Sequence, residues 1–151
     1  MHAKAPVRGD LFDCQCPTRQ LLDRIGTKWT SMAVKVLAQA APGEVRFAEL
    51  RRRMPGVSQK MLSVTLRNLV RDGLAIRRVE PTVPPRVHYR LTALGLSLEV
   101  PLAALRTWAE AHIAEIDYAN AVDDAQADAT SIQLHDTADS TVSDPSARDP
   151  R

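Results

Sequence analysis

The 151-residue chain contains little of what stabilises secreted proteins or anchors membrane proteins. Only two cysteines are present, Cys14 and Cys16, too few and too close for a disulfide framework. No apolar run approaches the roughly 18 residues that a membrane span needs, and the N-terminal segment lacks the apolar core of a signal peptide. We therefore expect a soluble cytoplasmic protein with no membrane partner.

Motifs of catalysis and of metal binding are also missing. The sequence has no Gly-rich phosphate loop, no nucleophile elbow and no paired carboxylates in a segment expected to be structured. His2 lies near Cys14 and Cys16, but no second Cys/His pair follows at a ligand spacing. We expect neither an enzyme nor a metal site, and no cofactor.

The net charge of +2 hides a division along the chain. Residues 1–116 carry a net charge of +8, and residues 117–151 carry −6. The 47 residues from Glu44 to Arg90 contain 11 basic and 4 acidic side chains. A basic middle with an acidic tail is typical of a nucleic-acid-binding protein, although a solvated Arg-rich surface gives the same count.

Capping and turn residues predict three helices in the first third of the chain. Cys16-Pro17 favours a helix start, and Gly26 suits the C′ position at its end. Thr27 caps a second helix, which Pro42-Gly43 ends. A short third helix then runs to the Pro55-Gly56 turn, with its apolar residues facing inward: Phe47, Leu50 and Met54.

The fourth predicted helix is the clearest. Ser58 is its N-cap, Val57 can pack on Leu62 one turn inside, and Gly73 closes it as a C′ residue. One face is apolar. The opposite face carries polar and basic residues around Val64: Lys60, Ser63, Arg67, Asn68 and Arg71.

The apolar residues then recur every 2 residues, as in a strand, instead of every 3.6 residues, as in a helix. Residues 86–91 alternate Arg86, His88 and Arg90 with three apolar side chains, after a Pro-rich turn at 81–85. This pattern predicts a two-stranded hairpin with a stiff tip and a basic outer face.

A long helix follows, with Thr92 as its cap. Its apolar positions from Leu98 to Ile116, with His112 among them, step by three and four residues, which is typical of a helix–helix seam. Pro101 is expected to kink or divide this helix. From about Val122 onward no periodicity remains, and we expect disorder.

Three helices, the last two joined by a tight Pro-Gly turn, followed by a basic hairpin, predict a winged helix-turn-helix, mainly α with a small β-hairpin (α+β). The fourth helix would present its polar face to a major groove of double-stranded DNA, and the hairpin would follow the backbone. The candidate DNA-binding residues are Ser58, Gln59, Lys60, Ser63, Arg67, Arg71, Arg77, Arg78, Arg86 and His88.

Several motifs resemble, in order and spacing, the HxlR family of bacterial winged-helix regulators, which are relatives of the MarR group. They lie between Cys16 and Ile116 and include Gly26-Thr27-Lys28-Trp29, Pro55-Gly56-Val57-Ser58-Gln59 and Leu91-Thr92-Ala93-Leu94-Gly95. The resemblance implies a homodimer that binds a palindromic operator, usually as a repressor. Thr27 departs from the family's common Gly-Gly-Lys-Trp, and the acidic tail is outside the family pattern.

The expected organisation is a flexible arm at 1–15, the winged domain with its dimerisation helix at 16–116, and an acidic disordered tail at 117–151. Cys16 matches the position of the cysteine that redox-sensing members use. A thiol at a helix N-terminus should be the more reactive of the two, with a small oxidant or electrophile as effector. Cys14 could resolve an oxidised Cys16, but a bridge across one residue is strained, so an intermolecular bridge across the dimer is favoured. The alternative is that Cys16 only packs under the first helix.

A second class of function is a winged-helix module for protein contact or thiol-redox chemistry without DNA binding. Such a surface would carry more exposed aromatic residues than this basic face does.

Overall fold

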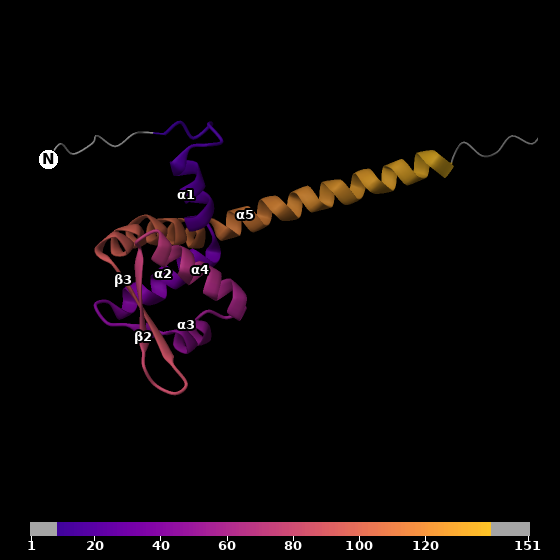
Figure 1. Ribbon diagram of the computed structural model, residues 1–151. Helices are drawn as coiled ribbons and strands as arrows, with labels where there is room; N and C mark the ends of the chain where they lie inside the picture. The colour runs from indigo at the N-terminus through magenta and orange to yellow at the C-terminus, as the bar shows by residue number, and fades with distance from the viewer. Residues whose placement is uncertain (1–8, 140–151) are drawn as a thin grey trace, which may run out of the picture. The chain divides into compact units, whose positions relative to one another are not determined.

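The computed structural model describes residues 9–139 (Figure 1). It divides into two compact units, residues 1–105 and 106–151. The elements are, in chain order, α1 (Pro17–Ile25), α2 (Lys28–Ala40), β1 (Val45–Arg46), α3 (Phe47–Arg53), α4 (Gln59–Arg71), β2 (Ala75–Glu80), β3 (Arg86–Leu91) and α5 (Ala93–Asp139). The predicted mainly helical winged fold is confirmed.

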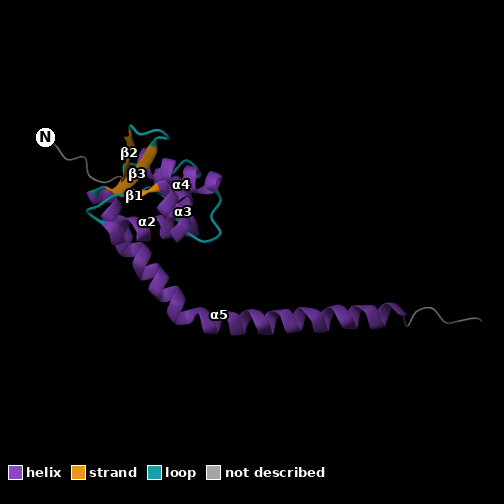
Figure 2. Ribbon diagram, turned by 90° about the horizontal axis from the view of Figure 1, so that it is seen from below, coloured by secondary structure: helices purple, strands orange, loops and turns teal. Residues whose placement is uncertain are grey.

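The sheet has three antiparallel strands in the order β1-β3-β2, where two were predicted. Figure 2 shows the strands together beside helices α2 to α4. Val45 pairs with Tyr89 and Arg46 with His88, so β1 adds an edge strand to the predicted hairpin. A strand of two residues is too short to show alternation, which is why the sequence did not reveal it.

The core of the first unit lies between α2, α3, α4 and the sheet. Leu37, Leu50, Met54, Leu62 and Leu66 are its largest fully buried side chains. They come from the faces that the three- and four-residue spacing predicted to be apolar. Burying these faces fixes the opposite face of α4 toward solvent.

Both ends of α2 and the start of α1 agree with the predicted caps, whereas Gly26 differs. Thr27 Oγ1 accepts a hydrogen bond from the Thr30 N–H at 3.2 Å, as an N-cap does. Gly26 is the C-cap of α1 with φ −78°, so it is not in the left-handed conformation expected of a C′ glycine.

Helix α5 differs from its prediction at its C-terminal end, where it continues to Asp139 instead of giving way to disorder near Val122. Pro101 lies inside the helix and does not divide it, so of the two predicted outcomes only a kink is left. The acidic segment lacks an apolar stripe, but it is rich in alanine, the strongest helix former. Helix propensity therefore favours a helix there even without packing. Residues 140–151 of the predicted tail and residues 1–8 of the predicted arm lie outside the described residues.

In the second unit, the helical residues expose several large apolar side chains. Trp108 is 54% exposed, and Ile113 and Ile116 are exposed as well. The rings of Trp108 and His112 stack with centroids 4.6 Å apart, and His112 Nδ1 lies 2.8 Å from the Trp108 carbonyl oxygen. The described part of this unit therefore has an apolar helix face that its own residues leave uncovered.

Candidate nucleic-acid interface

The two ends of α4 hold its polar face in place. Ser58 Oγ accepts a hydrogen bond from the Met61 N–H at 3.0 Å, and Gly73 at φ 72° ends the helix. The Leu74 N–H then donates to the Leu69 carbonyl at 2.9 Å, which completes a Schellman motif. Both predicted caps are confirmed, and they fix the length and the rotation of the helix.

The polar face of α4 presents cationic side chains to solvent. Lys60, Arg67 and Arg71 are exposed, and Ser63 is half-buried between them. Gln59 is also exposed at the first turn, where Arg51 Nη1 donates to its Oε1 at 3.5 Å. The Ser58 hydroxyl already accepts the capping hydrogen bond, so the main role of this side chain is to fix the start of the helix.

A depression of about 460 Å³ joins α4 to the hairpin. Its lining combines arginines of both elements with an apolar floor: Ser63, Arg67, Val70, Arg71, Arg77 and Tyr89. Arg77 pairs with Tyr89 in the sheet register, so both side chains lie on the sheet face directed toward α4. Three guanidinium groups around one concave surface give it a positive potential suited to a polyanion.

The remaining hairpin candidates lie on the other sheet face, because Arg78 pairs with His88, and Glu80 with Arg86. Arg78 is engaged by Glu44, with Nη2–Oε2 at 2.7 Å. This hydrogen bond, more than any other interaction, lowers the pKa of Glu44. The predicted basic outer face is therefore split between two surfaces, and part of its charge is neutralised.

His88 is likewise engaged. Its side chain is only 14% exposed, and its Nε2 lies 2.9 Å from Glu80 Oε2. This bond is the main cause that lowers the pKa of the Glu80 carboxyl. Of the hairpin candidates, Arg77 and Arg86 are thus the ones that form no ion pair with a described residue.

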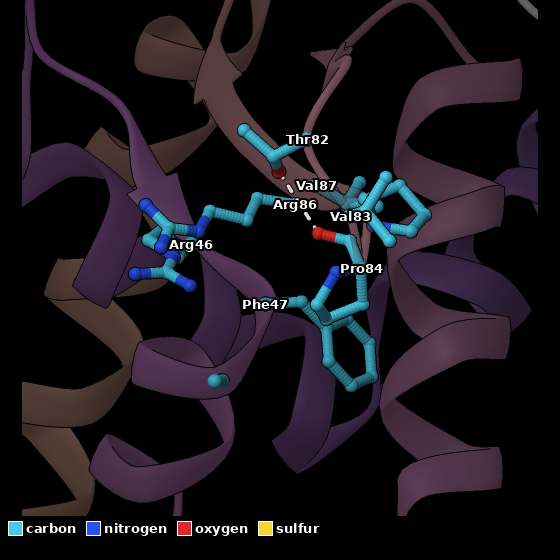
Figure 3. Close-up of a pocket in the computed structure, with 9 residues that line it drawn as sticks. Arg46, Phe47, Thr82, Val83, Pro84, Arg86 and Val87 are labelled. Carbon is cyan, nitrogen blue, oxygen red and sulfur yellow. Dashed lines mark hydrogen bonds between the residues drawn. The ribbon is translucent and has the colours of Figure 1, made fainter.

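Arg46 was not among the predicted residues, yet the structure places it beside Arg86. Both line a pocket of about 400 Å³ between the start of α3 and the tip of the hairpin (Figure 3). Its position follows from β1, the strand that sequence periodicity could not show. Glu44, the partner of Arg78, was missed for the same reason.

The two cysteines differ in accessibility. Cys16 is the N-cap of α1, as predicted, but it is 3% exposed, whereas Cys14 is exposed. Gly9 lies against the Cys16 sulfur, so close that a Cβ at residue 9 would be 2.4 Å from Sγ. The expectation that Cys16 is the more reactive thiol therefore meets a steric obstacle.

Two negative findings concern the described residues alone. No group of three or more His, Cys, Asp or Glu side chains there is arranged to hold a metal ion. In the same part of the chain, none of the helices has the length and apolar character required to cross a membrane.

A model of the HxlR-like helix-turn-helix matches residues 24–117, which include α4, the hairpin and the first half of α5. The chain belongs to the HxlR-like family. Members of this family are helix-turn-helix regulators of transcription, so the chain is a DNA-binding regulator with a MarR-like winged fold.

Relatives and solved structures agree with the family. The HTH-type transcriptional regulator YtfH of Escherichia coli K12 is 41% identical over 108 residues, which cover 72% of this chain and 83% of YtfH. The structure of the transcriptional regulator ytfH from Salmonella typhimurium superposes with a TM-score of 0.66 at 40% identity, and covers 72% of this chain and 94% of that one. The redox regulator HypR in its reduced form superposes at 0.57 with 36% identity, over 67% of this chain and 97% of HypR.

Proposed function

We propose that this regulator binds a palindromic operator as a homodimer and represses transcription, with α4 in the major groove. The observation that carries the proposal is the arginine-lined depression between α4 and β2. Arg67 reaches base edges from the exposed face of α4, and Arg77 binds backbone phosphate from the hairpin. Lys60 and Gln59, at the N-terminal end of the helix, enter the groove most deeply.

Uncovered apolar surface in each unit supports the dimer. In the first unit, α1 exposes Leu22, and an apolar hollow of about 310 Å³ lies beside it. The hollow is lined mainly by apolar side chains of α1 and α5: Leu21, Ile25, Leu94, Leu98 and Pro101. In the second unit, the apolar side chains of Trp108, Ile113 and Ile116 are exposed. A second copy that covers these faces removes apolar surface from water, and a two-fold dimer sets two recognition helices about 34 Å apart.

Fluorescence anisotropy with duplexes from the chain's own upstream promoter tests this function. We expect tight binding to one palindromic fragment and weak, strongly salt-dependent binding to a random duplex of equal length. Light scattering of the free protein at micromolar concentration should give the mass of a dimer. Equal affinity for every duplex, or a folded monomer, would contradict the proposal.

Control by a small oxidant or electrophile acting at the cysteines is the second part of the proposal. One structural relative is described as a redox regulator in reduced and oxidized forms. Oxidation of Cys16 must displace the segment around Gly9, and a shift of α1 would then alter the separation of the two α4 helices. Operator binding before and after diamide treatment, in wild type and in Cys16→Ser, measures this control. Unchanged binding of the fully oxidised protein would leave Cys16 as a packing residue.

A further inference from the structure

The pocket between the β1–α3 junction and the hairpin tip has two chemically different walls. Arg46 and Arg86 form one wall (Figure 3). The other is apolar and is formed mainly by Phe47 and the tip residues: Val83, Pro84, Pro85 and Val87. No carboxylate belongs to the residues that line it.

The two arginines of this pocket form no ion pair with any residue that the structure describes, whereas neighbouring arginines do. Arg78 binds Glu44, and Arg52 binds Glu49. Glu80, which lies opposite Arg86 in the sheet, is bound to His88 and does not line the pocket. Two guanidinium groups beside one another repel unless an anion lies between them, so this wall is complementary to an anion.

The backbone holds both walls in a defined arrangement. Arg46 belongs to β1 and Arg86 to β3, which pair directly in the sheet. At the tip, the Thr82 hydroxyl donates to the Pro84 carbonyl at 2.9 Å, and the Thr82 N–H donates to the Glu80 carbonyl at 2.8 Å. Proline further restricts the tip, so little ordering is required when a ligand binds.

We infer that this pocket binds one phosphodiester of the DNA backbone, with Arg46 and Arg86 on the phosphate oxygens and Phe47 with Pro84 against the deoxyribose. The inference rests on the proposed function and adds Arg46 to it. A phosphate with its attached sugar has the two chemical characters that the walls require. The contact is independent of base sequence, so it fixes the position of the hairpin on the duplex.

The test uses the full-length protein, the best-binding promoter duplex and a random duplex of equal length. Arg46→Ala should weaken binding to both about fivefold per half-site at 0.15 M salt and reduce the slope of log K against log salt by up to about 0.9 per half-site, because each protomer loses one of the two guanidinium groups on its phosphate. The matched control is Arg90→Ala, an exposed arginine on the same strand and sheet face as Arg86 that does not line the pocket. It should leave the slope close to that of wild type.

Single neutral methylphosphonates placed along the promoter duplex locate the phosphate. One position should weaken wild type about fivefold and weaken Arg46→Ala clearly less, since only Arg86 then remains as a partner for the charge that the methylphosphonate removes. Arg86→Ala should lose part of its sensitivity at the same position, so this variant serves as a second test if Arg46→Ala is unstable.

The outcomes separate the two proposals. If wild type binds no duplex, the proposed function fails. If wild type binds but Arg46→Ala behaves as Arg90→Ala does, or keeps the wild-type methylphosphonate profile, only the inference about this pocket is overturned.

Discussion

Arg24 and Asp72 form a two-pronged ion pair that ties α1 to the C-terminal end of α4. Arg24 Nε lies 2.9 Å from Asp72 Oδ2, and Arg24 Nη2 lies 3.0 Å from Oδ1. Asp72 is the C-cap of α4, so the helix expected to reach the operator is fixed to the helix whose first turn begins at Cys16. The hydrogen bond to Asp72 is the main cause that raises the pKa of Arg24.

Breaking this pair should lower the melting temperature of the protein. Arg24→Ala leaves Asp72 half-buried without its partner, and Asp72→Ala leaves the guanidinium without its partner. A double-mutant cycle by thermal unfolding should show that the double variant loses less than the two single losses together. Additive losses would mean that the pair is not coupled in solution.

Two glycines should fail for different reasons when replaced by alanine. A Cβ at Gly95 would lie 2.0 Å from the Leu74 carbonyl oxygen, so Gly95→Ala forces α5 away from the end of α4 and should cost about 3 kcal/mol. A Cβ at Gly73 meets no atom within 4 Å, but its φ of +72° should cost about 1–2 kcal/mol. Urea unfolding measures both. Gly73→Asn should recover part of the loss, and a Gly95→Ala variant as stable as wild type would contradict the close approach.

DNA recognition should divide between α4 and the hairpin. Arg67→Ala should cost about 1–3 kcal/mol per half-site on the promoter duplex and much less on random DNA. Arg86→Ala should weaken both duplexes alike and flatten the salt dependence. Anisotropy titrations at several salt concentrations separate the two effects, with Arg19→Ala, an exposed arginine of α1, as the control. Identical losses for both variants on both duplexes would refute this division.

The thiols should react in the order of their exposure. Native protein treated with a maleimide at pH 7 should be labelled first at Cys14 and much later at the buried Cys16, and both should react equally fast in urea. Gly9→Ala should speed labelling of Cys16, because the added methyl group cannot fit beside Sγ. Mass spectrometry of each labelled peptide gives the rates, and the rate of Cys14 in the same variant is the internal control. Faster labelling of native Cys16 than of Cys14 would mean that activation of the thiol at the helix N-terminus outweighs its burial.

Acid should destabilise the fold partly through Glu44 and Glu80. Both pKa values are lowered in the folded state, mainly by the bonds to Arg78 and His88, so the unfolded chain takes up these protons first as the pH falls. Their contribution to stability is fully present above about pH 5 and is lost as the pH falls through the unfolded value, about 4.3, toward the folded ones. Glu44→Gln should flatten the dependence of the melting temperature on pH below 5. In an Arg78→Ala background the same change should add little.

Sequence reasoning succeeded where local chemistry and periodicity agree. Ser58 and Gly73 bound α4 as their capping chemistry predicts, and the repeat of Leu62, Leu66 and Leu69 fixed its buried face. Because this face is buried, the side chains on the opposite face point outward. The periodicity of the sequence was therefore enough to predict the outward-facing cations: Lys60, Arg67 and Arg71.

The features that the sequence did not predict depend on contacts between residues that are distant in the chain, or on a composition that fits two structures. Strand β1 has two residues, so the positions of Arg46 and Glu44 follow only from its pairing with β3. Cys16 is buried against Gly9, seven residues away, a contact that the helix-capping pattern does not predict. The helix beyond Val122 lacks an apolar stripe, and its composition was typical of disorder as well as of a solvent-exposed helix.

The attachment between the end of α4 and the start of α5 fixes the C-terminal end of α4. The Thr92 hydroxyl donates to the Gly73 carbonyl at 2.7 Å, the Thr92 N–H donates to the Leu74 carbonyl at 3.0 Å, and Gly95 lies against the same backbone. The helix has 13 residues, so Gln59 lies about 20 Å from this attachment, and a tilt of about 5° at Gly73 would move Gln59 by nearly 2 Å. A small rotation at the attachment would therefore be amplified at the end of α4 that we propose enters the groove.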